Sequence, residues 1–327
     1  MNNMKILITG GSGFIGSQFL RQHVQSNPDY EFFNLDKLTY ASTHINEELH
    51  HYPNYQFAEI DLYDATLTTK AIQDFAPDTI IHFAAETHVD RSTYDGRPFL
   101  HSNIEGTYNL LTAARDLWKD DLDGKRFHFI STDEIFGSIT TGSFDENSPI
   151  QPRNIYSASK AAAHHLVLAF QNTYQLPVSI SICSNNFGPF QNQEKFIPTI
   201  IESALAKKRI PIYGSGSNVR DWIYVEDHCT AIWKIITTPA FEGETFNVSA
   251  QNTYTNLEIA HKVLTLLSKK TGENAIDLIE HVEDRLGHDL RYALNPAKLL
   301  RQTNWRPHFS LEKGLEKTID FYMNSTY

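Results

Sequence analysis

Two adjacent carboxylic acids, Asp133 and Glu134, follow Ser131 and Thr132 at the end of the apolar run RFHFI. Such a run is typical of a buried strand. Charges at that position are costly unless they are paired or used in chemistry. Limited solvation can separate the pKa values of two neighbouring acids, so that one serves as a base and the other as an acid. The alternative is an acid pair that interacts with the dipole at a helix N-terminus.

A tyrosine and a lysine four residues apart, Tyr156 and Lys160, lie in the segment IYSASKAAAHHLV. Residues i and i+4 share a helix face, so the phenol and the ammonium can line one pocket. A free tyrosine, with a pKa near ~10, is a poor base, but a lysine and a positively charged nicotinamide favour the phenolate. On an isolated helix such a pair is usually a solvated face. After a sheet strand in a dinucleotide-binding fold, it indicates acid–base catalysis.

The glycine-rich segment ITGGSGFIG, residues 8–16, follows an apolar run and opens a helical pattern. Gly10, Gly13 and Gly16 let the backbone turn tightly and approach a pyrophosphate, which the helix N-terminus binds. Asp36 ends the next predicted strand, 20 residues beyond Gly16. A carboxylate there accepts hydrogen bonds from the adenosine ribose and repels a 2′-phosphate, so we predict NAD rather than NADP, a preference that Lys37 softens. The alternative is a glycine turn without a ligand.

The elements that position these residues alternate between strands and helices. Strands are predicted at 5–9, 31–35, 55–60, 78–84, 126–131 and 177–183, with helices near 14–26, 64–75, 98–118 and 156–174. This alternation predicts an α/β fold with a doubly wound parallel sheet of the NAD-binding Rossmann type.

The pattern changes after about residue 186, where helices near 194–207, 225–237, 255–270 and 310–323 are joined by short strands and turns. We therefore expect an NAD-binding Rossmann domain over 1–185 and a smaller α/β substrate domain over 186–327. The boundary is approximate, and we expect it to be discontinuous, with a return near 219–250.

Composition narrows the class of protein. Twenty-eight basic and 39 acidic residues give a net charge of −11, which argues against nonspecific nucleic-acid binding. Two cysteines in 327 residues indicate a reducing compartment. No apolar run of about 18 residues predicts a membrane span, and Met1–Met4 lead directly into a strand, which leaves no room for a signal peptide. We expect a cytoplasmic enzyme without membrane or nucleic-acid partners.

Several longer blocks resemble the extended short-chain dehydrogenase/reductases, and among them the nucleotide-sugar 4,6-dehydratases, most closely the dTDP-glucose 4,6-dehydratase family. They run through nearly the whole chain: LDKLTYAS, FAAETHVDRS, STDEIFG, YSASKAAA, CSNNFGPFQNQEKFIP, NVRDWIYVEDHC and DRLGHDLRYA. The resemblance implies a lyase that uses NAD to dehydrate dTDP-glucose to dTDP-4-keto-6-deoxyglucose. It also implies a homodimer, formed through the helices near 98–118 and 156–174.

The resemblance gives the acid pair a role. It implies that Tyr156 takes the proton of the sugar's 4-hydroxyl while hydride leaves C4 for NAD. Glu134 would then remove the C5 proton, Asp133 would protonate the departing 6-hydroxyl, and hydride would return to C6 as a proton returns to C5. Thr132 would hydrogen-bond the 4-oxygen, and Lys160 would favour the phenolate. Because the cofactor is regenerated in each cycle, NAD is expected to stay bound.

Ligand positions follow from the same resemblance. Around the cofactor it implies Gly10, Gly13, Phe14, Ile15, Gly16, Asp36, Lys37, Thr39, Ser42, Asp61, Leu62, Phe83, Ala84, Ala85, Thr87, Asn103, Ser131, Tyr156, Lys160 and Asn185. Around the nucleotide-diphosphate hexose it implies His88, Asn186, Glu194, Lys195, Phe196, Pro211, Tyr213, Arg220, Asn247, Arg285, His288 and Tyr292. No metal is expected, since His164 and His165 point about 100° apart on a helix and no third ligand is apparent.

The chain departs from the family pattern at several positions, among them Ile182, Phe187 and Leu290. These departures are expected to reshape the walls around sugar and nucleotide, so the substrate is the least determined part of the prediction. The alternatives are the same chemistry on a UDP- or CDP-sugar, a 5,6-dehydratase, a 4-epimerase and an NAD-sensing protein without activity.

Overall fold

The structure, a computed structural model, describes residues 4–284 and 287–324. The chain divides into two compact units, each assembled from separate stretches of sequence. Unit 1 consists of Met1–Phe136, Pro149–Ile182 and Cys229–Phe246, and unit 2 of Gly137–Ser148, Cys183–His228 and Asn247–Tyr327.

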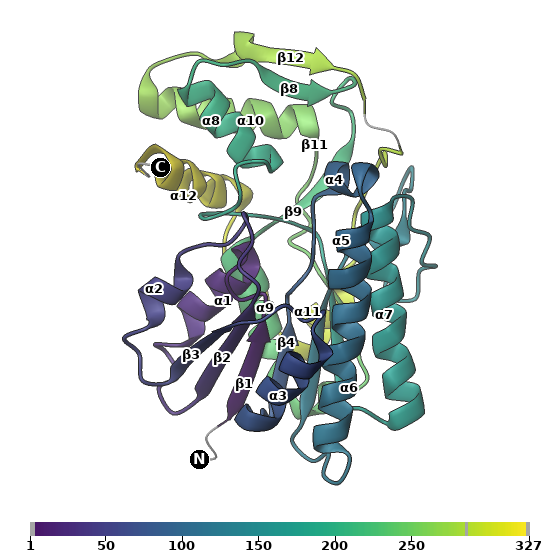
Figure 1. Ribbon diagram of the computed structural model, residues 1–327. Coiled ribbons are helices and arrows are strands. Elements are labelled where there is room, and N and C mark those ends of the chain that lie inside the picture. The colour runs from purple at the N-terminus through teal and green to yellow at the C-terminus, as the bar shows by residue number, and fades with distance from the viewer. Residues whose placement is uncertain (1–3, 285–286, 325–327) are drawn as a thin grey trace. The chain divides into compact units, whose positions relative to one another are not determined.

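Unit 1 is built on a seven-stranded parallel sheet in the order β10-β6-β5-β4-β1-β2-β3. Figure 1 labels four of these strands, β4, β1, β2 and β3. The strands β4, β5 and β6 are buried at every residue, as strands covered on both faces must be. The last residues of β6 and β10 fall in unit 2. The strands are β1 Lys5–Thr9, β2 Glu31–Asp36, β3 Tyr55–Glu59, β4 Thr79–His82, β5 Arg126–Thr132, β6 Val178–Cys183 and β10 Thr245–Val248.

Helices pack on this sheet in two groups. α6 neighbours both α3 and α7, and α1 meets α9 where the rings of His23 and Trp233 stack at 4.0 Å. This arrangement, with the parallel sheet, confirms the predicted doubly wound α/β fold. The helices are α1 Phe14–His23, α2 Ile45–Leu49, α3 Ala65–Phe75, α4 Val89–Tyr94, α5 Arg97–Phe99, α6 Gly106–Trp118, α7 Ile155–Tyr174 and α9 Val225–Ile236, whose first four residues fall in unit 2.

The single helix predicted over 98–118 is interrupted. It consists of α5, a π-helical turn over Leu100–Glu105 and α6. A π turn carries one more residue than an α turn and occurs frequently at functional sites. The turn places Asn103 beside the loop that follows β4, where it accepts a hydrogen bond from the Glu86 N–H, and Ser102 beside Lys37, which follows β2.

Unit 2 packs three helices, α8, α10 and α12, around a shared apolar core that includes Phe187, Trp222 and Leu264. A three-stranded sheet in the order β11-β9-β7 and a parallel pair, β8 and β12, complete the unit. The elements are β7 Asn185–Phe187, α8 Phe196–Leu205, β8 Ile210–Tyr213, β9 Val219–Tyr224, β11 Thr253–Thr255, α10 Asn256–Thr271, β12 Ile279–Val282, α11 Ala297–Thr303 and α12 Leu311–Asn324.

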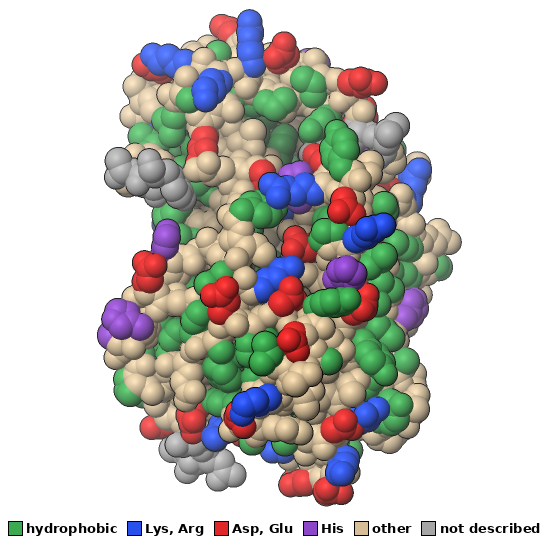
Figure 2. Space-filling view, viewed as in Figure 1, with side chains coloured by type: hydrophobic (Ala, Val, Ile, Leu, Met, Phe, Trp, Pro, Cys, Tyr) green, Lys and Arg blue, Asp and Glu red, His purple; other side chains and the backbone are tan. Residues whose placement is uncertain are grey.

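Acidic and basic side chains are interspersed on the face shown in Figure 2, without a broad area of one sign. Among the described residues, no helix is both long enough and apolar enough to cross a bilayer.

Candidate active site

The glycine turn links β1 to α1 with a backbone that needs glycine. Gly10 has φ +71°, and a Cβ there would lie 2.5 Å from the Cα and N of Ala84. At Gly16, the first turn of α1, a Cβ would lie 2.8 Å from the Cα of Gly11. The turn therefore lies directly against the loop that follows β4. The N-cap residue of α1, Gly13, provides no side-chain cap for the first residues, Phe14 and Ile15, and a helix N-terminus of this kind can bind an anion.

Asp36, the last residue of β2, is tied to the same turn. Its carboxylate accepts hydrogen bonds from the backbone N–H groups of Ser12 and Leu38, both at 2.9 Å. Burial raises the pKa of Asp36, while these two hydrogen bonds and the charge of Lys37 act in the opposite direction. The arrangement fits a dinucleotide: the backbone at Gly10 leaves no room for a side chain, and the carboxylate lies at the strand end where a ribose binds.

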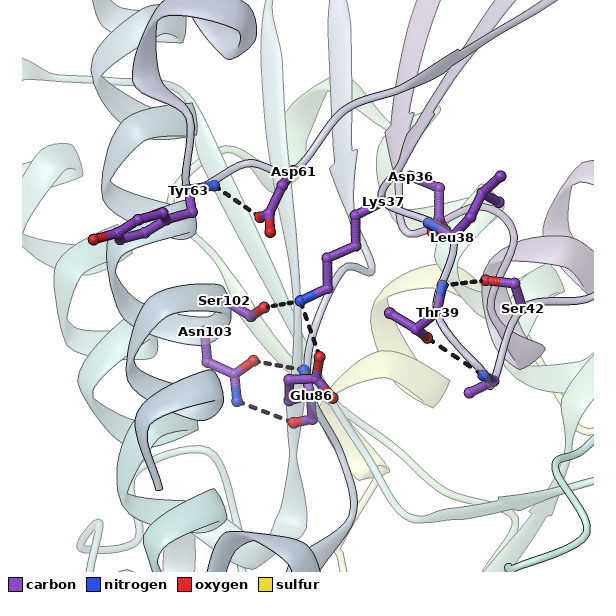
Figure 3. A network of polar contacts seen from close by, with 11 residues as sticks. Asp36, Lys37, Leu38, Thr39, Ser42, Asp61, Tyr63, Glu86, Ser102 and Asn103 are labelled. Carbon is purple, nitrogen blue, oxygen red and sulfur yellow. Dashed lines mark hydrogen bonds and ion pairs between the residues drawn. The ribbon is translucent and has the colours of Figure 1, made fainter. Parts of the chain in front are cut away.

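The loops around this turn bring other predicted cofactor residues together (Figure 3). Thr39 and Ser42 close the loop after β2 by a hydrogen bond of 2.9 Å from the Thr39 N–H to Ser42 Oγ, and Asp61 accepts one of 3.0 Å from the Tyr63 N–H. Lys37 extends toward Glu86 and Ser102, both in contact with its ammonium group. Of the remaining predicted residues, Leu62 is buried, Phe83, Ala84 and Ala85 are half-buried, and Thr87 is exposed.

Asn103 holds the loop after β4 in place. Its side chain accepts from the Glu86 N–H at 2.8 Å, donates to the Glu86 carbonyl at 3.0 Å and donates to Ser159 Oγ at 2.8 Å. Ser159 in turn donates to the main-chain carbonyl of Tyr156 at 2.7 Å. Asn103 was predicted as a cofactor ligand, and in the structure its amide links the loop at Glu86 to α7.

The acid pair stands at the carboxyl end of β5, as its sequence position predicted. Asp133 is buried and Glu134 is half-buried, and together they open a 3₁₀ turn. Thr132 donates to Asp133 Oδ1 at 3.3 Å and accepts from the Glu134 N–H at 3.4 Å. Asn154 Nδ2 lies 3.4 Å from Glu134 Oε2. The open edge of a parallel sheet at its carboxyl end is where ligands bind in such folds.

Tyr156 and Lys160 lie in the first turns of α7 and are both buried. Asn154 caps this helix by accepting from the Ser157 N–H at 2.8 Å, while Ser157 Oγ accepts from the Asn154 N–H, which forms a capping box. Lys160 Nζ donates to the Ile130 carbonyl at 2.7 Å and lies 4.4 Å from the centre of the Phe129 ring. The cap thus fixes where the helix begins and, with it, where the phenol and the ammonium lie relative to β5.

Two buried histidines near Lys160 are uncharged at neutral pH. Burial, followed by the charge of Lys160, lowers the pKa of His82 to about 3. Burial, followed by the charges of His165 and Lys160, lowers the pKa of His164 to about 4. His82 hydrogen-bonds Thr9 and Thr107, and His164 hydrogen-bonds Ser131, a predicted cofactor residue. Neither ring competes with Lys160 as a cation at pH 7.

The predicted substrate residues lie mostly in unit 2. Arg220 is held by hydrogen bonds to the carbonyls of Val219 and Asp289, with its guanidinium 4.3 Å from the centre of the Tyr292 ring. The Tyr292 hydroxyl donates to the Asp289 carboxylate. A guanidinium carries five N–H donors, so this clamp leaves donors for an anion.

Other substrate residues occupy several elements of unit 2. Asn186 bonds His228 at 2.9 Å, Lys195 precedes α8, and Phe196 stacks on Trp222. The rings of Tyr213 and His288 meet edge to face, and Pro211 is exposed on β8. Glu194 is half-buried, and Asn247 is fully buried, donating to the Phe144 carbonyl.

Arg285 lies outside the described residues. His88, in unit 1, caps α4. Among the described residues, the side-chain oxygens of Asn185 and Asn247 are buried without a hydrogen-bond partner, and no cluster of three or more side chains could hold a metal ion.

The structure adds residues that the sequence did not indicate. Phe99 packs edge to face on Tyr156, Asn154 both caps α7 and contacts Glu134, and Glu86 pairs with Lys37. The only sequence signal is an asparagine directly before a helical pattern, which is typical of a cap. Phe187, expected at a wall of the substrate site, lies instead in the core of unit 2, whereas Leu290 is exposed.

This glycine turn, the tyrosine–lysine pair and the strand-end acids define an extended short-chain dehydrogenase/reductase. The profile described as GDP-mannose 4,6 dehydratase matches residues 7–318. The chain belongs to this family.

Known proteins and solved structures match this chain over nearly its whole length. The dTDP-glucose 4,6-dehydratase of Neisseria gonorrhoeae is 43% identical over 333 residues, covering 98% of this chain and 96% of the relative. The dTDP-glucose 4,6-dehydratase DesIV of Streptomyces venezuelae, solved with NAD and dTDP bound, superimposes with a TM-score of 0.90 at 38% identity and covers 98% of this chain and 97% of its own. A UDP-glucose 4-epimerase of Thermus thermophilus, solved with NAD, gives 0.87 at 26% identity, covering 99% and 100%.

Proposed function

We propose that this protein is an NAD-dependent lyase that dehydrates dTDP-glucose to dTDP-4-keto-6-deoxyglucose. The observation that carries the proposal is the acid pair at the end of β5, in the same unit as the tyrosine–lysine pair of α7. Removing water from C5 and C6 needs a base and an acid beyond those of a simple dehydrogenase. Two of the proteins named above, from Neisseria gonorrhoeae and Streptomyces venezuelae, carry the name of this activity and are 43% and 38% identical to this chain.

Unit 1 is the proposed NAD-binding unit. The turn at Gly10, Gly13 and Gly16 and the N-terminus of α1 would hold the pyrophosphate, and Asp36 would hold the adenosine ribose. NAD, when bound, supplies oxidation at C4 and reduction at C6 of the sugar. In unit 2, the buried side-chain oxygen of Asn185 lacks a partner among the described residues, which supports a polar ligand at that side chain.

The roles of the protein's own groups follow from their surroundings. Tyr156 would remove the proton from the 4-hydroxyl, and the Lys160 ammonium would favour its phenolate. Glu134, half-buried beside the amide of Asn154, would remain ionised and remove the C5 proton. Asp133, buried, would hold a proton and pass it to the departing 6-hydroxyl, because burial disfavours a charged carboxylate. Thr132 would hydrogen-bond the 4-oxygen.

Unit 2 is the proposed site of the nucleoside diphosphate. The clamp on Arg220 fixes a planar cation, which suits a diphosphate because its fork can bind two oxygens at once. We propose in addition that the protein acts in the cytoplasm, which its low cysteine content, two in 327 residues, supports, and as a homodimer. Exposed apolar side chains on α6 and α7, including Tyr108 and Tyr174, support the dimer.

The test is a panel of dTDP-, UDP-, CDP- and GDP-glucose and UDP-GlcNAc, each with and without added NAD, with products identified by mass and NMR. Loss of one water from dTDP-glucose, giving a 4-keto sugar with a C6 methyl, is the expected result. Water loss only from another donor would keep the chemistry and change the substrate. Inversion at C4 without water loss would contradict the proposal and indicate an epimerase.

A further inference from the structure

The loops that flank the glycine turn are joined by an ion pair. Lys37 follows β2, and Glu86 lies in the loop after β4. In the sheet these two strands are the neighbours of β1, so the pair spans the end of the strand that carries the glycine turn. The Lys37 ammonium lies 2.9 Å from Glu86 Oε1 and donates to Ser102 Oγ at 2.7 Å (Figure 3). Both charged side chains are mostly shielded from solvent, with exposures of 30% and 21%.

The partner of Lys37 is fixed by bonds that do not involve the Glu86 carboxylate. Asn103 holds the Glu86 backbone at both its N–H and its carbonyl, and it is anchored to α7 through Ser159. The main chain at Glu86 is thus set independently of its side chain. Removing the negative charge of Glu86 is therefore expected to leave the loop where it is.

This pairing changes what Lys37 offers to a dinucleotide. A lysine directly after the strand-end acid is positioned to attract a 2′-phosphate, which would weaken the selectivity for NAD expected from Asp36. Together, however, the Glu86 and Asp36 carboxylates outnumber the one ammonium. The Lys37 ammonium has three N–H donors, and it already contacts Glu86 and Ser102. A dianionic phosphate at this position meets a net negative charge.

We propose that Glu86 determines cofactor specificity by neutralising and holding Lys37, so that the site rejects NADP. This inference rests on the proposed binding of NAD in unit 1. Glu86 is a positioning residue that acts through Lys37, and Ser102 assists by holding the ammonium without adding charge.

The experiment compares wild type and Glu86→Gln for the dinucleotide that they hold. Each purified protein is incubated to a plateau with equal, excess concentrations of NAD and NADP, passed through a desalting column and denatured, and the released nucleotides are quantified by chromatography. Glutamine keeps the size and an acceptor for Lys37 but removes the charge. The bound NADP-to-NAD ratio is expected to rise about tenfold, equal to about 1.4 kcal/mol, and the rise should shrink in high salt.

Two further variants test whether the change in the NADP-to-NAD ratio is due to Lys37. The double variant Lys37→Met with Glu86→Gln is expected to return the ratio to the wild-type value or below, since the freed cation is gone. Glu273→Gln, which removes the carboxylate from a different lysine–glutamate pair, that with Lys207 at 3.0 Å, should leave the ratio unchanged.

An unchanged ratio in Glu86→Gln, or an equal loss of both dinucleotides, would overturn the specificity role. Wild type that holds neither dinucleotide would instead contradict the proposed function, which keeps the two failures distinct.

Discussion

Lys160 is buried where α7 packs on β5. It donates to the Ile130 carbonyl and faces the Phe129 ring, both of which compensate a cation. The neighbouring rings of His82 and His164 have pKa values of about 3 and about 4, lowered chiefly by burial, so they carry no charge at pH 7. Positive charge near Tyr156 therefore comes from a side chain whose position is fixed by the main chain of β5.

Replacing Tyr156 by phenylalanine tests the proposed acid–base role. The change removes only the hydroxyl and keeps the ring that packs on Phe99, so folding should be retained. Turnover of dTDP-glucose is expected to fall about 10²–10⁴-fold, the usual contribution of a positioned acid–base group. Steady-state kinetics with product analysis provide the measurement. Tyr174→Phe, on an exposed ring at the other end of α7, is the matched control and should keep full activity.

His164 makes stability depend on pH in a defined direction. Its pKa is lowered to about 4 by burial, from 6.5 in the unfolded chain, so between these values the unfolded chain binds the extra proton. The contribution of His164 to the free energy of unfolding is therefore fully present above pH 6.5. As pH falls toward 4, about 3 kcal/mol of this contribution is lost.

The matched variants are His164→Asn and the exposed neighbour His165→Asn. Urea unfolding at pH 7.5 and pH 5 should show a smaller pH dependence in His164→Asn than in wild type, because the titrating ring is gone. His165→Asn should retain most of the wild-type dependence. Equal pH dependence in wild type and His164→Asn would show that this ring is not buried uncharged. His23, His82 and His228, also with lowered pKa values, act in the same direction.

Among the elements, the β1–α1 turn is the most constrained by its backbone. Gly10 combines a positive φ with the main chain of Ala84 at 2.5 Å from a built Cβ, whereas Gly124, with φ +68°, has nothing within 4 Å. Comparing the two positions therefore separates the energetic cost of a left-handed backbone from the cost of a steric clash.

Gly10→Ala and Gly124→Ala form a matched pair. In both variants an alanine must adopt the left-handed conformation, which costs about 1 kcal/mol. Only Gly10→Ala must also displace the loop after β4. We expect Gly124→Ala to lower the free energy of unfolding by about that amount and to keep its bound dinucleotide. Gly10→Ala is expected to lose more stability and to purify with less dinucleotide. Urea unfolding and chromatography of released nucleotide measure both effects, and equal losses would argue against the crowding.

How far the sequence predicts these elements depends on whether their cause is local. Six of the seven strands of the unit 1 sheet and the glycine turn were predicted closely, because apolar runs and glycine spacing act over a few neighbouring residues; β10 was not predicted. The π-helical turn at Leu100–Glu105 was not predicted, because its residue Asn103 bonds residues that are distant in sequence. The Asn154–Glu134 and Lys37–Glu86 contacts escaped prediction for the same reason: each depends on how separate strands and helices come together.

At the scale of the whole molecule, the two units are expected to respond to different ligands. If unit 2 binds the nucleoside diphosphate, dTDP should slow hydrogen exchange around Arg220 and Tyr292, which are clamped together in that unit. At 100 times its dissociation constant, a ligand stabilises the folded state by about 2.7 kcal/mol. Hydrogen exchange followed by mass spectrometry, with added NAD and dTDP separately, measures the response.

The control ligand is inorganic pyrophosphate, which has the diphosphate without the nucleoside. Weaker protection than with dTDP is expected, because only the arginine contacts remain. Protection by dTDP confined to the glycine turn of unit 1 would contradict the assignment of unit 2 to the nucleotide.

The order of strands in the seven-stranded sheet bears on how the chain is made. β6 lies between β5 and β10, but β10 begins about 60 residues after β6 ends. On the ribosome, at ~5–20 residues per second, the nascent chain spends roughly 3–12 s with one edge of a wholly buried strand unpaired. An open apolar edge is a template for aggregation. The sheet can therefore be completed only after residue 248 has been translated, and not once the first 185 residues are made. The need for chaperones should be greatest just before that point.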